Sequence, residues 1–109
     1  MGSTIMAGPL VVLESGTIEG TFNGEAEAVR IFRAIPFAAP PTGENRWRKP
    51  QPVIPWDGVL DCTRFSPACP QTDALVRMYG IAPSVLDEDC LYLNVFTPAK
   101  EWSSMATCP

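Results

Sequence analysis

Proline is distributed very unevenly along this chain of 109 residues, and that distribution limits the secondary structure that the chain can form. The sequence holds 12 prolines, and eight of them lie between Pro36 and Pro70. Because proline lacks a backbone N–H and clashes with the preceding helical turn, no long helix can cross this segment. Turn residues recur every few positions there. We therefore expect this proline-rich segment to be mostly irregular, with one short strand at residues 59–61.

The sequence before the proline-rich segment is typical of short strands. Residues 10–13 are an apolar run rich in β-branched side chains, and residues 17–22 alternate between the two faces of a strand. Asn23 and Gly24 follow directly, and this pair predicts a reversal because both residues tolerate positive φ. Residues 28–35 alternate again and are expected to return alongside. Together these patterns predict an antiparallel meander of two or three strands.

The sequence after the proline-rich segment carries the clearest strand pattern of the chain, at residues 91–97, and Pro98 ends it. Between Gln71 and Asp87 the signals are weaker, and residues 73–79 predict one helical turn. The tail, residues 101–109, shows no periodicity.

Within the proline-rich segment, the aromatic residues are expected to fasten the chain onto a larger surface that the chain itself does not supply. These anchors are Phe37, Trp47, Trp56 and Phe65.

Composition excludes several classes of function. The sequence contains no histidine, so neither a Ser-His-acid site nor a Cys-His site can be built from it. The formal charge is −4 and the basic residues are scattered, so we expect no nucleic-acid partner. Apolar runs are far shorter than the roughly 20 residues that span a bilayer, so no membrane span is expected. Gly8-Pro9 interrupts the apolar N-terminus and no basic residue precedes it, which leaves the compartment unknown.

The four cysteines and the one acidic cluster each allow more than one interpretation. Cysteines stand at positions 62, 69, 90 and 108, without a C-x-x-C pair, so no metal site and no cofactor is predicted. They allow three disulfide pairings, or they are free thiols in a reducing compartment. The acidic cluster, residues 87–89, is either a solvated turn or holds an arginine, of which Arg46 and Arg48 are the nearest basic pair. No nucleophile accompanies it, so we assign it no acid–base chemistry.

Two longer motifs carry a family resemblance. Residues 88–95, EDCLYLNV, with Thr97-Pro98 resemble the second signature of the type-B carboxylesterases, an α/β-hydrolase family. Residues 32–43, FRAIPFAAPPTG, are similar to the family pattern F-x-G-I-P-Y-A-x-P-P-x-G. Ala34 stands where the family usually has glycine, and Phe37 where it has tyrosine, and both departures are expected to be mild. Further matches follow in the family's order at Arg46-Trp47, Pro50, Trp56, Asp57-Gly58, Cys69 and Gln71.

The resemblance covers about residues 10–100 and implies the N-terminal portion of an α/β-hydrolase fold. In this portion we expect mostly antiparallel strands and proline-rich loops with little helix. The implied organisation is an N-terminal extension at residues 1–9, an incomplete carboxylesterase domain at residues 10–100, and an atypical tail at residues 101–109. The tail is unlike the family's next strand, so a fragment is expected, from a truncated reading frame, a frameshift after Lys100 or an incomplete gene.

The resemblance also implies two structural contacts. Family members with cysteines at the places of Cys69 and Cys90 join them in a disulfide that closes a surface loop near the active-site gorge. Cys62 and Cys108 match no family cysteine and are expected to be free. An ion pair between Arg46 and Glu88 is implied to tie the proline-rich segment to the start of the last strand.

The activity implied for the parent protein is hydrolysis of small-molecule carboxylic esters through an acyl-enzyme. The family's H-G-G-G stretch, its G-x-S-x-G nucleophile motif and its histidine are absent from these residues. We therefore assign this chain no catalytic residue and expect it to be inactive alone. The alternative is a fragment of a non-catalytic, cholinesterase-like adhesion protein. An independent small binding module conflicts with the strand edges that it would leave unpaired.

Overall fold

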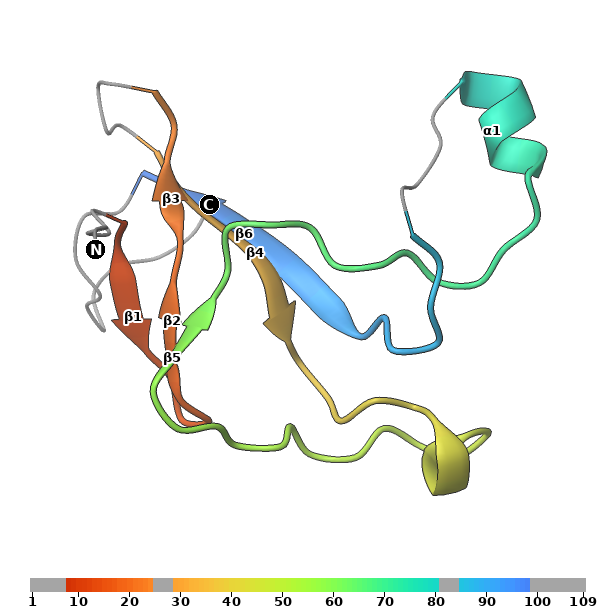
Figure 1. Ribbon diagram of the computed structural model, residues 1–109, viewed down its shortest axis with the longest axis horizontal. Coiled ribbons are helices and arrows are strands. Elements are labelled where there is room, and N and C mark those ends of the chain that lie inside the picture. Colours follow the sequence, from red (N-terminus) through yellow and green to blue (C-terminus); the bar gives the residue numbers. More distant parts are fainter. Residues whose placement is uncertain (1–7, 25–28, 81–84, 99–109) are drawn as a thin grey trace, which may run out of the picture.

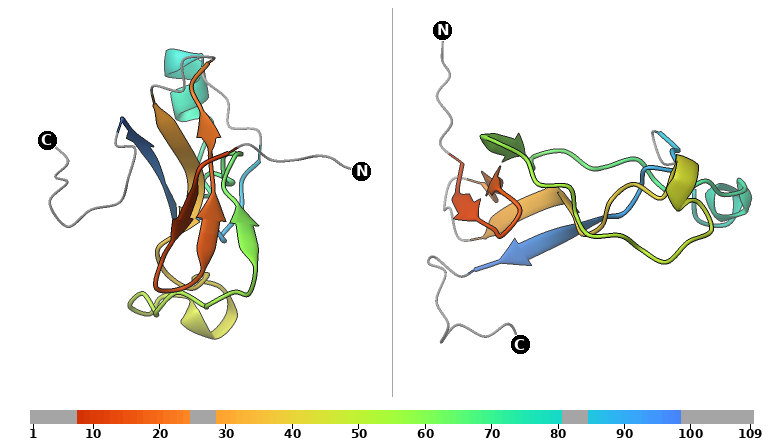
Figure 2. Two further views of the ribbon diagram at one scale, coloured as in Figure 1. Left: turned by 90° about the vertical axis from the view of Figure 1, so that its left-hand side faces the viewer. Right: turned by 90° about the horizontal axis from the view of Figure 1, so that it is seen from below.

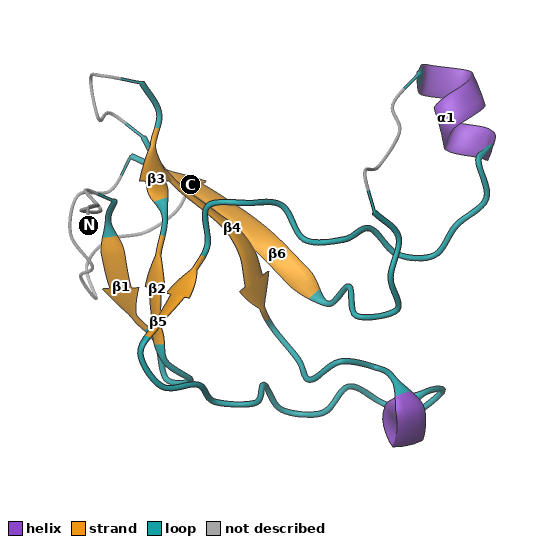
Figure 3. Cartoon of the chain, viewed as in Figure 1, coloured by secondary structure: helices purple, strands orange, loops and turns teal. Residues whose placement is uncertain are grey.

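The computed structural model describes residues 8–24, 29–80 and 85–98. These residues form two three-stranded sheets, and two long excursions lead away from them (Figure 1). One excursion contains a 3₁₀ turn, η1 (Gly43–Asn45), and the other a short helix, α1 (Ala74–Tyr79). The expectation of mostly strands and loops with little helix is confirmed for this part of the chain (Figure 3).

The first sheet joins β1 (Leu10–Val12), β2 (Thr17–Glu19) and β5 (Val59–Asp61), in the order β1-β2-β5. β1 and β2 are antiparallel, as the meander predicted. β2 and β5 are parallel, with Ile18 opposite Leu60. The sequence predicted β5 as a strand but gave no indication of this pairing, because a parallel partner need not be near in the chain.

The second sheet joins β3 (Thr21–Phe22), β4 (Arg30–Pro36) and β6 (Tyr92–Thr97), all antiparallel, in the order β3-β4-β6. The single strand predicted at residues 17–22 is therefore wrong, because Gly20 divides it between the two sheets. A Cβ at Gly20 would collide with the carbonyl oxygen of Ile31 and with the ring of Phe32. The absent side chain thus lets the backbone cross closely over β4.

The reversal predicted at Asn23-Gly24 lies where expected, and Gly24 has a φ of 69°. The Asn23 amide donates to the carbonyl oxygen of Val29 at 2.9 Å, so the connection is longer than a two-residue hairpin turn. The residues between Gly24 and Val29 lie outside the described part of the chain.

A β-bulge interrupts β4, because its register against β6 shifts between Phe32 and Ile35. Ala34 lies in the bulge with a φ of 63°, in the left-handed region that favours glycine. Its amide donates to Oδ1 of Asn94 on β6 at 3.0 Å. The unbroken alternation expected for residues 28–35 is therefore wrong. The expectation that alanine here is a mild departure is also corrected, since left-handed backbone costs an alanine about 1–2 kcal/mol.

The core lies where the two sheets meet. Its most buried side chains are Ile18 from β2, Phe32 from β4 and Cys62 directly after β5. Half-buried apolar side chains surround them, namely Val11, Leu13, Ile35, Trp56, Leu60 and Val95. In Figure 2 the strands gather at one end of the molecule, and the excursions with η1 and α1 extend away from it.

Of the aromatic anchors in the proline-rich segment, only Trp56 packs against this core. Its ring lies over Gly16, and its Nε1–H donates to the carbonyl oxygen of Thr17 at 2.9 Å. The expectation that Trp56 needs a surface from outside the chain is therefore wrong. Phe37, Trp47 and Phe65 are exposed, and Trp47 is exposed to 97%.

Candidate functional site

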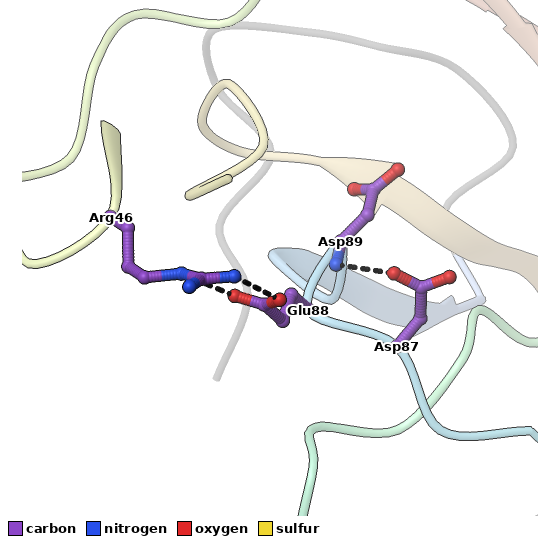
Figure 4. A network of polar contacts seen from close by, with 4 residues as sticks. All are labelled: Arg46, Asp87, Glu88 and Asp89. Carbon is purple, nitrogen blue, oxygen red and sulfur yellow. Dashed lines mark hydrogen bonds and ion pairs between the residues drawn. The ribbon is translucent and has the colours of Figure 1, made fainter. Parts of the chain in front are cut away.

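An ion pair joins the two excursions at Arg46 and Glu88, which are 42 positions apart (Figure 4). Arg46 follows η1 directly, and its Nε donates to Oε1 of Glu88 at 2.9 Å while a terminal nitrogen contacts Oε2. Two parallel bonds fix the orientation of both side chains. The side chains are 53% and 44% exposed, so solvent weakens their attraction. The contact thus positions the proline-rich segment against the residues that precede β6.

The other two carboxylates of the acidic cluster shape the turn into β6. Oδ1 of Asp87 accepts the amide hydrogen of Asp89 at 2.9 Å, and Oδ1 of Asp89 accepts the hydroxyl hydrogen of Tyr92 at 2.8 Å. Burial, this hydrogen bond and the charges of Asp89 and Asp87 raise the pKa of Tyr92 to about 12. Both interpretations of the cluster therefore hold in part: Glu88 binds an arginine, and its neighbours organise a turn.

Cys69 and Cys90, the predicted disulfide partners, lie side by side with free thiols. A hydrogen bond with the Cys69 side chain, followed by burial and the nearby negative charges, raises the pKa of Cys90 to about 11. Backbone hydrogen bonds join the same two segments of the chain. The Ala68 amide donates to the carbonyl oxygen of Val85 at 2.9 Å, and the Asp87 amide donates to the carbonyl oxygen of Ala68 at 3.0 Å. The excursion that carries α1 thus begins and ends at this contact. The disulfide itself stays a prediction.

Cys62 is fully buried, and its thiol lies 3.8 Å from the carbonyl oxygen of Ala34. Burial, with a smaller contribution from Asp61, raises its pKa to about 11. Such a thiol is protonated at neutral pH and is a packing residue rather than a nucleophile. Cys62 is unpaired, as expected, and Cys108 lies outside the described residues.

The described residues contain no group of side chains that could form a metal centre. Within residues 8–24, 29–80 and 85–98, no three His, Cys, Asp or Glu side chains group closely enough to hold a metal ion. The same ranges include no helix with the length and apolarity to cross a bilayer. What the geometry brings together is the Arg46–Glu88 ion pair, the Cys69–Cys90 contact and the Asp89–Tyr92 hydrogen bond. These are positioning contacts, and they lie where β6 begins.

Sequence reasoning missed two of the polar contacts around β6. The spacing of Asp89 and Tyr92, three positions apart at the start of a strand, could have indicated the first. The bond from the Ala34 amide to Asn94 spans 60 positions and has no local signal, although the glycine preference of the family at position 34 points to a special backbone there.

Comparison with known proteins places this geometry in context. Residues 7–109 match the sequence profile of the Carboxylesterase family. A medium-chain fatty acyl-CoA hydrolase precursor of Anas platyrhynchos is 38% identical over 103 residues, which cover 84% of this chain and 18% of that protein. The fumonisin B1 esterase of Sphingopyxis macrogoltabida is 44% identical over 87 residues, covering 80% of this chain and 15% of that protein.

Solved structures agree. A thermophilic PNB esterase superimposes with a TM-score of 0.73 at 39% identity, covering 82% of this chain and 18% of that one. The juvenile hormone esterase of Manduca sexta does so with a TM-score of 0.72 at 38% identity, covering 82% and 17%. The chain therefore has the fold of the matching part of these α/β-hydrolase esterases, and it spans less than a fifth of their length.

Proposed function

Because this chain belongs to the carboxylesterase family, we propose that it is the N-terminal part of a serine carboxylic-ester hydrolase. The observation that carries the proposal is the match over residues 7–109, together with the 38–39% identity to the esterases of known structure. The parent enzyme cleaves small carboxylic esters through an acyl-enzyme. Its nucleophile, acid and histidine come from residues beyond this chain, which has no histidine of its own.

In this proposal the chain contributes the scaffold that borders the active site. The two sheets fix the ends of the excursions, and the Arg46–Glu88 ion pair holds the excursions together. A disulfide between Cys69 and Cys90 closes the loop that carries α1 and forms one wall of the gorge mouth. The thiols already lie in contact, which supports this pairing over one with the buried Cys62.

The alternative, a non-catalytic adhesion protein built on the same scaffold, is not favoured. The relatives named above are a hydrolase and an esterase, and both structural neighbours are esterases. Nothing within this chain's residues favours adhesion instead.

The proposal is tested with a chimera in which residues 8–98 replace the matching segment of the thermophilic PNB esterase. We expect the chimera to hydrolyse para-nitrophenyl acetate, because the transplanted segment has the host's fold. The control is the host from which the same segment has been deleted, which should be inactive. The 109-residue chain alone should stay at background. A chimera that is soluble and has the host's circular dichroism but no activity would contradict the proposal.

A further inference from the structure

Arg33 lies in β4 beside the bulge, and its side chain stacks on two aromatic rings. The centre of its guanidinium is 4.7 Å from the ring centroid of Phe65 and 5.7 Å from that of Phe96. Phe65 follows β5 and Phe96 belongs to β6, so the contact joins three segments of the chain. The Arg33 amide donates to the carbonyl oxygen of Cys62 at 2.8 Å, which fixes the backbone below it. We call these three side chains the Arg33 clamp.

The guanidinium of the Arg33 clamp has no acceptor in the described part of the chain. Its Nε is shielded from water and makes no hydrogen bond. The ion pairs among the described residues are Arg46–Glu88 and Arg77–Asp73, and neither includes Arg33. A shielded N–H of a charged group that makes no hydrogen bond is unfavourable. The charge of Arg33 therefore has no carboxylate partner among the described residues.

The surroundings of the guanidinium indicate what that acceptor is. Arg33 as a whole is half-buried, and Nε is its one side-chain nitrogen that is both shielded and without a partner. Phe65 is 68% exposed and Phe96 is 56% exposed, so two apolar walls flank the cation. A guanidinium binds a carboxylate through two parallel hydrogen bonds, and the stacked rings already restrict its orientation. An acidic side chain whose stem packs on the rings fits both features.

We propose that the Arg33 clamp binds an acidic side chain from the part of the parent polypeptide that follows this segment. This inference rests on the proposed function, since it needs the longer parent. The length of the relatives supports the choice of occupant: the matching segment is only 18% of the thermophilic esterase, so most of that protein is available to cover these exposed rings. The clamp is a docking contact between this segment and the remainder of the enzyme.

Carbodiimide cross-linking of the chimera tests this contact directly. In the Arg33→Lys variant the new amine can form an amide only with a carboxylate that lies against it. We expect mass spectrometry to find the peptide with position 33 linked to an Asp or Glu peptide of the host portion. The matched control is Arg48→Lys, at an exposed position, which should give no such link. A link to an acid of residues 8–98, a link between two copies, or no link would each overturn the proposal.

A second variant tests the contact without relying on the position of the new lysine side chain. Arg33→Gln should lower the chimera's urea midpoint at pH 7, and this loss should shrink progressively as the pH falls below about 4, because the acceptor carboxylate is then protonated. If Arg33 only packs on the rings, the loss will not depend on pH in this range, and the proposal fails.

The measurements separate this inference from the proposed function. Ester hydrolysis by the unmutated chimera reports on the function, and cross-linking reports on the clamp. An active chimera without the link refutes the clamp alone. If the chimera does not fold, the 109-residue Arg33→Lys chain is co-expressed with the rest of the host and treated in the same way. Absence of the link there also counts against the clamp.

Discussion

The sheets and the excursions of this molecule are held by different forces. Where the sheets meet, Ile18, Phe32 and Cys62 are almost fully buried, and each strand is paired with at least one neighbour. In the excursions, apolar side chains such as Trp47 and Met78 are exposed, and single polar contacts hold the chain. A partly exposed ion pair contributes about 0–1 kcal/mol, whereas one buried phenylalanine contributes roughly 1.5–3 kcal/mol. Burial therefore contributes more to holding the sheets than single polar contacts contribute to holding the excursions.

The largest expected effect on the free energy of unfolding comes from removing an aromatic side chain from the core of the sheets. Phe32→Ala in the chimera is expected to lower the free energy of unfolding by about 3–5 kcal/mol, because it leaves a cavity where the sheets meet. Urea titration followed by circular dichroism measures it. Val12→Ala at the end of β1 in the other sheet, at a side chain that is 79% exposed, should change it by less than about 0.5 kcal/mol. Similar losses for both variants would show that no such core exists.

The next effect concerns the excursion that carries α1. Oxidation should join Cys69 to Cys90, and the closed loop of about 20 residues should stabilise the chimera by roughly 3 kcal/mol relative to Cys69→Ser. Peptide mapping without reduction identifies the pair. Cys62 should react with alkylating reagents only after denaturation, because it is buried. A Cys62–Cys69 peptide as the main product would disprove the pairing.

A smaller effect is expected at the bulge of β4. Ala34→Gly should raise the free energy of unfolding by about 0.5–1 kcal/mol, since glycine removes the left-handed strain but adds entropy to the unfolded chain. Ala38→Gly is the control: Ala38 is buried and has no positive φ, so this change should destabilise. If both substitutions destabilise, Ala34 is not strained.

The Arg46–Glu88 ion pair should show a coupling energy of at most about 1 kcal/mol. A double-mutant cycle with Arg46→Gln and Glu88→Gln measures it, and 1 M NaCl should reduce it. The more exposed pair of Asp73, directly before α1, and Arg77 within α1 serves as a comparison and should couple more weakly. A coupling energy of several kcal/mol would mean that this ion pair orders the excursions. Packing against the rest of the parent enzyme would then not be needed to order them.

The last effect, which appears only at high pH, is a titration at the start of β6. Tyr92 should ionise near pH 12 in the folded chimera, as seen by ultraviolet absorbance, and Tyr92→Phe should remove that step. Because the folded pKa is raised above the unfolded value of about 10, the stabilisation from Tyr92 is complete below pH 10 and is lost as the pH rises towards 12. Ionisation of Tyr92 near pH 10 would contradict its hydrogen bond to Asp89.

Local signals predicted most elements but not how they assemble. The sequence placed β1, β5, β6 and α1 within a residue or two, because alternation and turn residues are local. It could not show that Gly20 divides a strand between sheets, since periodicity is the same on both sides of the division. The parallel pairing of β2 with β5 and the bulge at Ala34 depend on residues distant in the chain.

The candidate site was accessible from the sequence only through the family resemblance. Without the resemblance, the sequence did not distinguish Arg46 from Arg48 as the partner of an acidic residue. It also left three disulfide pairings open. The resemblance singled out Arg46 with Glu88 and Cys69 with Cys90, and each pair lies in contact in the structure. The Arg33 clamp had no signal of either kind, because its three residues come together only when β4, β5 and β6 are assembled.

The separation of β4 from β6 along the chain determines how long β4 must wait for its partner during synthesis. β4 ends at Pro36 and its partner begins at Tyr92, so the ribosome must add more than fifty residues before the pair can form. At about 5–20 residues per second, this takes roughly 3–11 s. Throughout that time one edge of β4 is unpaired on the nascent chain and available to other strands. This interval, rather than the finished structure, is where a chaperone would have most to protect.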